Sequence, residues 1–251
     1  MTDEEILALT RSIEVWYHRI ELRPGIITPG FNDSPENLRL LGLPADCTGM
    51  RALDIGARDG YFSFELEKRG AEVTAVDYMP STTTGFSIAA HLLGSKARYL
   101  QENIYNLSRK TLGEFDIVLF LGLLYHLPDP LGALRIVRTL CRGLMFLETL
   151  VIDGLVFLPD GRKAALQELH PALSELPLMQ FFPGSSRNND KTNFWGPNLK
   201  CVQDMLIESE FRILDSQLNV DRAIVRCATE SDPEKLYQWR IATGAENPGA
   251  N

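Results

Sequence analysis

The sequence lacks the features that would place a protein in a membrane or send it out of the cell. Its longest apolar stretches, residues 117–127 and 144–150, are too short to span a bilayer and are better interpreted as buried strands. The chain begins with the acidic residues MTDEE, without the basic and apolar segments of a secretory leader. We therefore expect a cytoplasmic protein that does not bind membranes.

Little in the sequence favours a metal or a nucleic acid as partner. The four cysteines are scattered, form no CxxC pair and have no histidine at zinc spacing, so we expect reduced, buried thiols and no metal. The 33 acidic residues outnumber the 25 basic ones and give a net charge of −8. A polyanion would need a local basic patch to bind such a protein, so the charge favours a small-molecule partner.

No Gly/Ser-rich linker or long charge run divides the 251 residues, which predicts a single domain. Short, nearly continuous apolar runs alternate with helical stretches, which is typical of a parallel sheet covered on both faces. Two further runs, 211–215 and 223–228, are expected to pair antiparallel. The pattern predicts an α/β fold with a doubly wound, mostly parallel, Rossmann-like sheet of seven strands whose last strand is antiparallel. The runs expected to be parallel strands are residues 52–55, 73–77, 98–100, 117–120 and 144–147.

Further segments surround the expected core of residues 49–153. A capping box at Thr2 and Glu5, followed by apolar residues at helical spacing as far as Ile20, predicts an amphipathic helix within an N-terminal cap, residues 1–48. Residues 154–197 are rich in Pro, Asn, Gly and aromatics, which favours an ordered cover over the substrate rather than a disordered loop. Residues 198–230 are expected to form the last helix and hairpin, and the tail, 244–251, is expected to fray.

The strongest motif is the sequence LDIGARDGY at residues 53–61, where a strand runs through a glycine-containing turn into a helix. Gly56 and Gly60 would let the backbone approach a ligand closely, and the start of the helix would offer free N–H groups. About twenty residues later Asp77 ends the second strand, where an acid in a nucleotide-binding sheet accepts hydrogen bonds from a ribose diol. The motif therefore predicts a cofactor with a nucleoside part.

The turn lacks the G-x-G-x-x-G spacing of a dinucleotide site. Its acids, Asp54 and Asp59, would repel a pyrophosphate and attract a cationic sulfonium. The motif resembles motif I of class I S-adenosylmethionine (SAM) dependent methyltransferases. This resemblance implies SAM as cofactor, S-adenosylhomocysteine as its product, an adenine contact after the third strand and the reacting methyl after the fourth. The residues expected to bind the cofactor are Asp54, Gly56, Ala57, Arg58, Gly60, Asp77, Tyr78, Asn103, Ile104 and Leu121.

Two longer motifs, LYHLPDPL at 124–131 and LETLVIDG at 147–154, resemble a narrower group of methyltransferases. This group includes the enzyme that carboxymethylates 5-hydroxyuridine at the tRNA wobble position. The resemblance implies a clamp of lysine, tyrosine and arginine on a carboxylated SAM, and here Tyr125 and Arg222 match the last two. The corresponding region, residues 16–19, has no lysine. Because that removes a strong charge-assisted contact, carboxy-SAM is less expected than SAM.

Methyl transfer needs the lone pair of the acceptor in line with the S–CH3 bond, and a base can remove the acceptor's proton. His126 is the candidate base, and the alternative is a structural histidine bonded to the Asp129 turn. Tyr125 is expected to line the methyl pocket and Glu148 to orient a donor on the acceptor. The candidate substrate residues are Tyr17, His18, His170, Phe181, Phe182, Trp195 and Arg222.

The sequence leaves three functions open. The first is methyl transfer to an oxygen or nitrogen of a small-molecule acceptor in a biosynthetic pathway, which the acidic composition and the aromatic residues of 154–197 favour. The second is modification of the tRNA wobble uridine, which the two long motifs favour. The third is a protein that keeps the cofactor pocket without turnover. The acceptor and the oligomeric state do not follow from the sequence.

Overall fold

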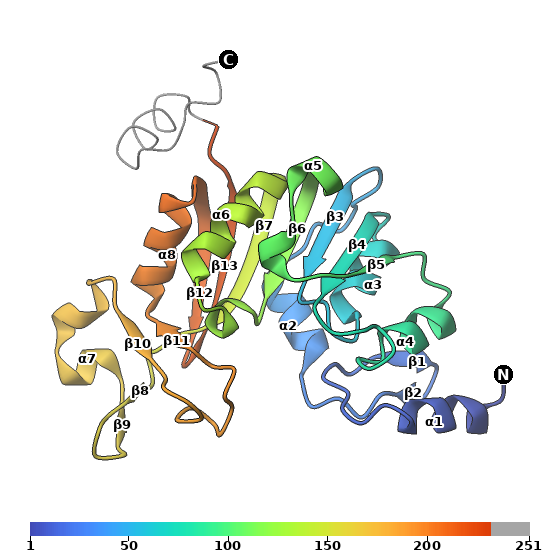
Figure 1. Ribbon diagram of the computed structural model, residues 1–251, viewed down its shortest axis with the longest axis horizontal. Helices are drawn as coiled ribbons and strands as arrows, with labels where there is room; N and C mark the ends of the chain where they lie inside the picture. Colours follow the sequence, from blue (N-terminus) through green and yellow to red (C-terminus); the bar gives the residue numbers. More distant parts are fainter. Residues whose placement is uncertain (232–251) are drawn as a thin grey trace. The chain divides into compact units, whose positions relative to one another are not determined.

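The computed structural model describes residues 1–231, and its chain forms two compact units. The first unit runs from Met1 to Leu123 and the second begins at Leu124. Figure 1 colours the first unit from blue to green and the second from green to red. The predicted single domain and its internal boundaries stay predictions, and the tail expected to fray, 244–251, lies outside the described residues.

Seven strands form one mixed sheet in the order β12-β13-β7-β6-β3-β4-β5 (Figure 1). In the first unit, β3 pairs in parallel with both β6 and β4, and β4 pairs in parallel with β5. In the second unit, β13 pairs antiparallel with β7 and with β12. The predicted seven-stranded α/β sheet with an antiparallel last strand is confirmed. The strands are β3 (Arg51–Ile55), β4 (Glu72–Asp77), β5 (Arg98–Gln101), β6 (Phe115–Leu121), β7 (Cys141–Leu150), β12 (Phe211–Asn219) and β13 (Arg222–Thr229).

The buried strands of the first unit account for its continuous apolar runs. All of β3 after its first residue is buried, and so is all of β4 after its first residue. Because β3, β4, β5 and β6 run parallel, their carboxyl ends lie along the same edge of the sheet. No helix within residues 1–231 combines the length and the apolar character that a membrane crossing requires. The helices between the strands are α3 (Tyr61–Lys68), α4 (Phe86–Leu93), the 3-10 turn η1 (Ile104–Asn106) and α5 (Arg109–Leu112).

The N-terminal helix is shorter than the sequence predicts. Helix α1 spans Asp3–Arg11 and begins with the predicted capping box, but residues 16–18, expected near its end, lie in a non-helical segment. Residues 17 and 18 are held by a tertiary contact instead: the N–H groups of Tyr17 and His18 donate to a carboxylate oxygen of Asp59, at 2.5 and 2.8 Å. These N–H groups are therefore not available to a helix. The rest of the cap forms β1 (Glu21–Arg23), β2 (Ile26–Ile27) and α2 (Ser34–Leu41).

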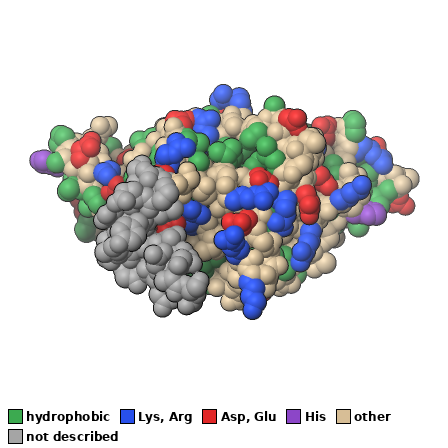
Figure 2. All heavy atoms as spheres, turned by 90° about the horizontal axis from the view of Figure 1, so that it is seen from above, with side chains coloured by type: hydrophobic (Ala, Val, Ile, Leu, Met, Phe, Trp, Pro, Cys, Tyr) green, Lys and Arg blue, Asp and Glu red, His purple; other side chains and the backbone are tan. Residues whose placement is uncertain are grey.

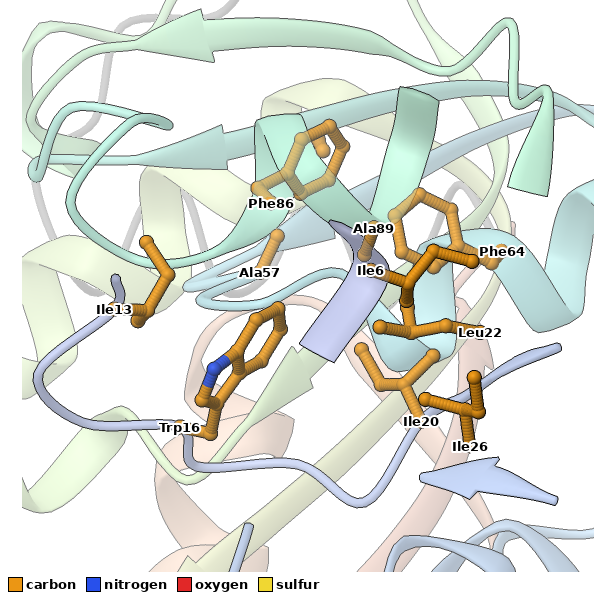
Figure 3. Packing of buried hydrophobic residues seen from close by; sticks show 11 residues of the cluster. Ile6, Ile13, Trp16, Ile20, Leu22, Ile26, Ala57, Phe64, Phe86 and Ala89 are labelled. Atoms are coloured by element: carbon orange, nitrogen blue, oxygen red, sulfur yellow. The ribbon is translucent and has the colours of Figure 1, made fainter. Parts of the chain in front are cut away.

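The non-helical segment carries Trp16 into the core of the first unit (Figure 3). This side chain is 3% exposed, and its indole N–H donates to a backbone carbonyl at 2.8 Å. Gly85 lies so close that a Cβ added there would come 2.6 Å from the indole ring. The same cluster holds Ala57 of the turn after β3 and the rings of Phe64 and Phe86. The N-terminal cap and the expected cofactor turn thus share one core.

The second unit contains the long segment that follows β7. Residues 154–197 form short elements that the sequence pattern does not predict, although its aromatic content does predict order. Four of the apolar residues in this unit pack around Tyr125, namely Leu150, Ile152, Leu166 and Phe182. The elements are η2 (Leu124–His126), α6 (Pro130–Leu140), β8 (Val156–Phe157), β9 (Lys163–Ala164), α7 (Leu166–Leu169), η3 (Pro171–Ser174), β10 (Met179–Phe181), β11 (Trp195–Pro197) and α8 (Leu199–Glu208), whose N-cap is Asn198.

Replacing Trp16 by alanine should destabilise the first unit. Truncating a buried tryptophan costs about 3–5 kcal/mol, and here the cavity would open between the cap and Gly85. Urea unfolding followed by circular dichroism should show a fall of that size in the free energy of unfolding. Val15, which is 46% exposed, provides the control, and Val15→Ala should change the stability by less than about 0.5 kcal/mol. Equal effects of the two substitutions would contradict this packing.

Candidate functional site

The turn after β3 is fixed to the end of β4 by backbone hydrogen bonds. Gly56 N and Ala57 N both donate to Val76 O, at 2.8 and 3.1 Å. Gly60 then precedes α3 in a left-handed conformation with φ of 91°. A Cβ added to Gly60 would come 2.6 Å from the rings of two phenylalanines, so both the backbone and the packing require glycine there. The second glycine of the motif is therefore a structural requirement of this turn.

Asp77 lies at the carboxyl end of β4 and is only 6% exposed. Its Oδ2 accepts from Arg58 N and its Oδ1 from Met79 N, both at 3.0 Å. Each carboxylate oxygen has a further lone pair for another donor. The Arg58 side chain is turned toward Met79, with Nη1 at 2.8 Å from Sδ. Asp77 is thus held in one orientation, as an acceptor for a ribose diol needs to be.

The two other acids of the motif have partners inside the first unit. Asp54 accepts from Ser63 Oγ at 2.6 Å, and burial raises the pKa of Asp54 to about 6. Asp59 is fully buried and holds the N–H groups of Tyr17 and His18. Burial also raises the pKa of Asp59 to about 6, although these N–H donors oppose the shift. From the sequence we expect both carboxylates to face a charged ligand, and no sequence pattern indicates these internal partners.

His18 is a buried residue of the N-terminal cap. It is 5% exposed, and its ring lies among the rings of Tyr17, Tyr61 and Phe62. Its Nδ1 lies 3.9 Å from Asp59 Oδ2. Burial, with repulsion from a nearby arginine, lowers the pKa of His18 to about 3, so the ring is neutral at pH 7. Roles for Tyr17 and His18 in acceptor binding stay predictions.

The other expected cofactor residues follow the neighbouring strands. Tyr78 comes directly after β4 and is 67% exposed, and Leu121 ends β6. Asn103 begins η1, where its side chain accepts from Tyr105 N at 3.0 Å, and Ile104 is buried behind it. The edge thus carries a fixed carboxylate, a glycine turn that brings the backbone close and the start of α3. These residues fit a cofactor that has a ribose and an adenine.

In the second unit, three residues singled out in the sequence come together. Glu148 on β7 accepts from the Nε and Nη2 atoms of Arg222 on β13, and the Nη2 to Oε2 distance is 2.6 Å. The guanidinium carbon of Arg222 lies 5.1 Å from the centre of the Tyr125 ring. The pairing is bidentate, which is a strong geometry for arginine and a carboxylate. Glu148 therefore positions Arg222, and the sequence expectation that it orients an acceptor group stays a prediction.

The hydrogen bonds of His126, the candidate base, determine which of its ring nitrogens can accept a proton. Its Nδ1 lies 3.0 Å from Thr192 O and 2.9 Å from Thr192 Oγ1. Because the Thr192 hydroxyl donates its one proton to Asp190 Oδ1 at 2.6 Å, it can only accept from the imidazole. The proton of a neutral His126 therefore lies on Nδ1, and Nε2 keeps its lone pair. The alternative, a structural histidine bonded to the Asp129 turn, stays a prediction; Asp129 Oδ1 accepts from Gly132 N in the first turn of α6.

The expected aromatic pocket is divided between two environments. Phe182 is buried in the core with Tyr125, whereas its neighbour Phe181 is 53% exposed and packs on Trp195 at 5.0 Å. The two side chains point to opposite sides because successive residues of an extended chain alternate. His170 begins η3, where its Nδ1 accepts from Ala172 N at 3.2 Å. In the structure Phe182 thus packs in one cluster with Tyr125, whereas His170 caps η3.

The sequence does not predict three residues that contact Phe182 or His126, directly or through one another. These are Arg187, Asp190 and Thr192. They lie in the connection between β10 and β11, where no spacing rule predicts which side chain turns inward. Within residues 1–231 there is no group of three His, Cys, Asp or Glu side chains that could hold a metal ion. All four cysteines are buried.

Comparison with known proteins identifies the family. The methyltransferase domain family matches residues 34–190, more than half of the chain, and the chain belongs to this family. The methyltransferase class predicted from the motif at residues 53–61 is therefore confirmed. The N-terminal domain of EvdMO1, solved with SAH and D-fucose present, has 19% identity and a TM-score of 0.64 over 92% of this chain and 98% of that one. This neighbour shows the fold, and its bound SAH agrees with SAM as the predicted cofactor.

Two curated relatives represent two kinds of methyltransferase. A ubiquinone biosynthesis O-methyltransferase of Xanthomonas euvesicatoria is 29% identical over 119 residues, which are 47% of this chain and 50% of that protein. A tRNA U34 carboxymethyltransferase of Chromohalobacter salexigens is 34% identical over 132 residues, which are 49% of this chain and 39% of that protein. The chain spans about half the length, or less, of these curated relatives. The second relative confirms the resemblance to the wobble-uridine group.

Asp59 should make the stability of the first unit depend on pH. Its pKa is raised from 3.8 to about 6, so between these values the folded state keeps a proton that the unfolded chain releases. The stabilisation is complete below about pH 4 and is lost as the pH rises to 6. Because asparagine does not titrate, the stability of Asp59→Asn relative to wild type should rise by about 2–3 kcal/mol from pH 4 to pH 7 in urea unfolding.

The exposed Asp46 provides the control for this experiment. Its pKa is lowered by hydrogen bonds from Thr48, so its linkage to folding has the opposite sign. Asp46→Asn should therefore show no such rise between pH 4 and pH 7. A difference between Asp59→Asn and wild type that does not change with pH would contradict the assignment of Asp59 as a buried, raised carboxyl.

Proposed function

We propose that this protein transfers a methyl group from SAM to an oxygen or nitrogen of a small-molecule acceptor. The observation that carries this proposal is the arrangement of His126, Thr192 and Asp190 in the second unit, which leaves His126 Nε2 able to accept a proton. We assign cofactor binding to the first unit and acceptor binding, with the base, to the second.

The residues of the first unit would hold the cofactor by its nucleoside. When bound, SAM supplies a methyl group on a cationic sulfur. Asp77 would accept from the ribose diol, because each of its oxygens keeps a lone pair beside the backbone N–H that orients it. The turn from Gly56 to Gly60 would let the backbone come close, and Asn103 and Ile104 would contact the adenine, as the resemblance to the family implies.

His126 would act as the general base. An alcohol or amine acceptor must lose a proton when its lone pair forms a bond to carbon, and Nε2 would take that proton. Burial lowers the pKa of His126, although Thr192 and Asp190 oppose the shift, so the ring is neutral and able to accept at pH 7. Once His126 is protonated, Asp190 would stabilise its charge through Thr192. The Tyr125 ring, 4.2 Å from the imidazole, would form the wall beside the acceptor.

The pairing of Arg222 supports SAM over carboxy-SAM. In the wobble-uridine enzymes the matching arginine is expected to meet the extra carboxylate of the cofactor. Here Glu148 already takes two N–H groups of Arg222. A second carboxylate would be placed beside the Glu148 charge and would be repelled by it. This occupied arginine and the missing lysine favour the ordinary cofactor.

A second candidate is the modification of a tRNA wobble uridine, which the Chromohalobacter salexigens relative supports. Binding of a polyanion would be favoured by a continuous basic surface. On the face shown in Figure 2, the Lys and Arg side chains of the described residues are interspersed with Asp and Glu. With the net charge of −8, this mixture favours a small-molecule acceptor.

Replacing Asp77 by alanine should weaken SAM binding. Losing a hydrogen-bond acceptor that is charged costs about 1.5–3 kcal/mol, which corresponds to a rise in Kd of at least tenfold. Isothermal titration calorimetry with SAM measures this change directly. Glu72→Ala removes an exposed carboxylate from the opposite end of the same strand and should leave Kd unchanged. An unchanged Kd for a folded Asp77→Ala protein would overturn the cofactor assignment.

Replacing His126 by alanine should lower turnover and spare SAM binding. A positioned general base contributes about 10²–10⁴-fold to rate, so kcat should fall within that range while the calorimetric Kd for SAM stays the same. Thr192→Val keeps the shape of residue 192 but loses the hydroxyl, and should move the acid limb of the pH–rate profile as well as lower kcat. A wild-type rate in His126→Ala would demote the histidine to a structural residue.

A further inference from the structure

Arg187 is a buried cation that the proposed function does not yet use. The residue is 2% exposed and lies in the connection between β10 and β11. Its guanidinium carbon is 4.3 Å from the centre of the Phe157 ring and 5.8 Å from that of Phe182. The backbone at this point is fixed, because Arg187 O accepts from Asn193 Nδ2 at 3.3 Å and from Asp190 N at 3.0 Å. These hydrogen bonds fix the backbone from which the buried Arg187 side chain extends.

The hydrogen bonds of Arg187 are incomplete. Its Nη2 donates to Asp221 Oδ2 at 3.1 Å, but its Nε and Nη1 atoms are fully buried and have no partner among the described residues. The aromatic contacts do not replace these bonds, because rings cover the faces of a guanidinium while its N–H groups point outward in its plane. Leaving buried donors unpaired is unfavourable, and more so when the group is charged.

The charged residues around Arg187 differ in how completely their charges are paired. Arg222 makes a bidentate contact with Glu148, so a neighbouring carboxylate already compensates its charge. Asp221, the one ion-pair partner found for Arg187 within residues 1–231, is 36% exposed and so is partly screened by water. Burial lowers the pKa of Arg187, and Asp221 only partly opposes this shift. The positive charge of Arg187 is therefore less completely compensated than that of Arg222.

We propose that Arg187 is the specificity residue of the acceptor site and binds a carboxylate carried by an otherwise apolar acceptor. This inference rests on the proposed function, because it names the class of small molecule that would be methylated. Nε and Nη1 provide three N–H donors for the oxygens of the acceptor. Phe157, Phe182 and Tyr125 provide the apolar surface for the rest of the molecule.

A carboxylate fits these observations better than a neutral group. An ionised acceptor makes hydrogen bonds that are about twice as strong as neutral ones, and in a desolvated site it offsets the charge of the guanidinium. An aromatic or aliphatic acid would bury its apolar part against the same cluster that stacks on Arg187. The hydroxyl or amino group to be methylated would lie elsewhere on the molecule, within reach of His126.

The test compares benzoate with benzamide, two probes of the same shape that differ in charge. Each is titrated without SAM against the full chain, and Kd is measured by ligand-observed NMR. Wild type should bind benzoate at least tenfold more tightly than benzamide. Arg187→Gln should remove this preference, and Arg187→Lys should keep only part of it, because lysine retains the charge but loses the planar set of donors.

Arg162→Gln is the matched control, since Arg162 lies in the same 154–197 segment but is exposed and pairs with Asp160 at the surface. This variant should keep the full preference for benzoate. Equal Kd values for the two probes in wild type would overturn the inference, and so would an unchanged preference in Arg187→Lys or in a folded Arg187→Gln. A wild-type protein that binds SAM but does not prefer benzoate would refute this inference alone, whereas failure to bind SAM would refute the proposed function.

Discussion

The first unit depends on one buried carboxylate and the two backbone N–H groups that it holds. Asp59 lies in the turn after β3 and could not stay buried without donors, which come from Tyr17 and His18, about 40 residues earlier in the chain. This contact fixes the non-helical segment after α1, in which Trp16 lies against Gly85. The cap, the glycine turn and α4 thus become parts of one core, and the cofactor edge is built on it.

The fold was predictable where burial alone decides the structure. Strands β3, β4 and β6 are enclosed on both faces, so their apolar runs are nearly continuous and indicate parallel strands without further information. The end of α1 was not predictable, because helical spacing of apolar residues continues to Ile20 while the contact with Asp59 lies far away in the sequence. Local periodicity cannot report a competitor for backbone hydrogen bonds that comes from another segment.

The candidate site was predictable in part for the same reason. Asp77 and the glycine turn follow from strand ends, and Tyr125, His126 and Arg222 follow from motifs. The sequence could not show that Glu148 makes a bidentate contact with Arg222, since the two residues are 74 positions apart and meet through the pairing of β7 with β13. Nor could it show that Thr192 sets the tautomer of His126. The contact of Thr192 with His126 depends on the path of residues 182–194, whose sequence carries no periodic signal.

The connection between Phe182 and Phe194 is tied at both ends. Phe182 N donates to Phe194 O, and Phe194 N donates to Tyr125 O, at 2.8 and 2.9 Å. These hydrogen bonds hold the two ends of the connection close together. The same loop supplies both Arg187 and the threonine that orients His126. On the roles proposed above, one short segment carries both the residue that recognises the acceptor and the residue that orients the base, so a change in the path of this segment would affect both.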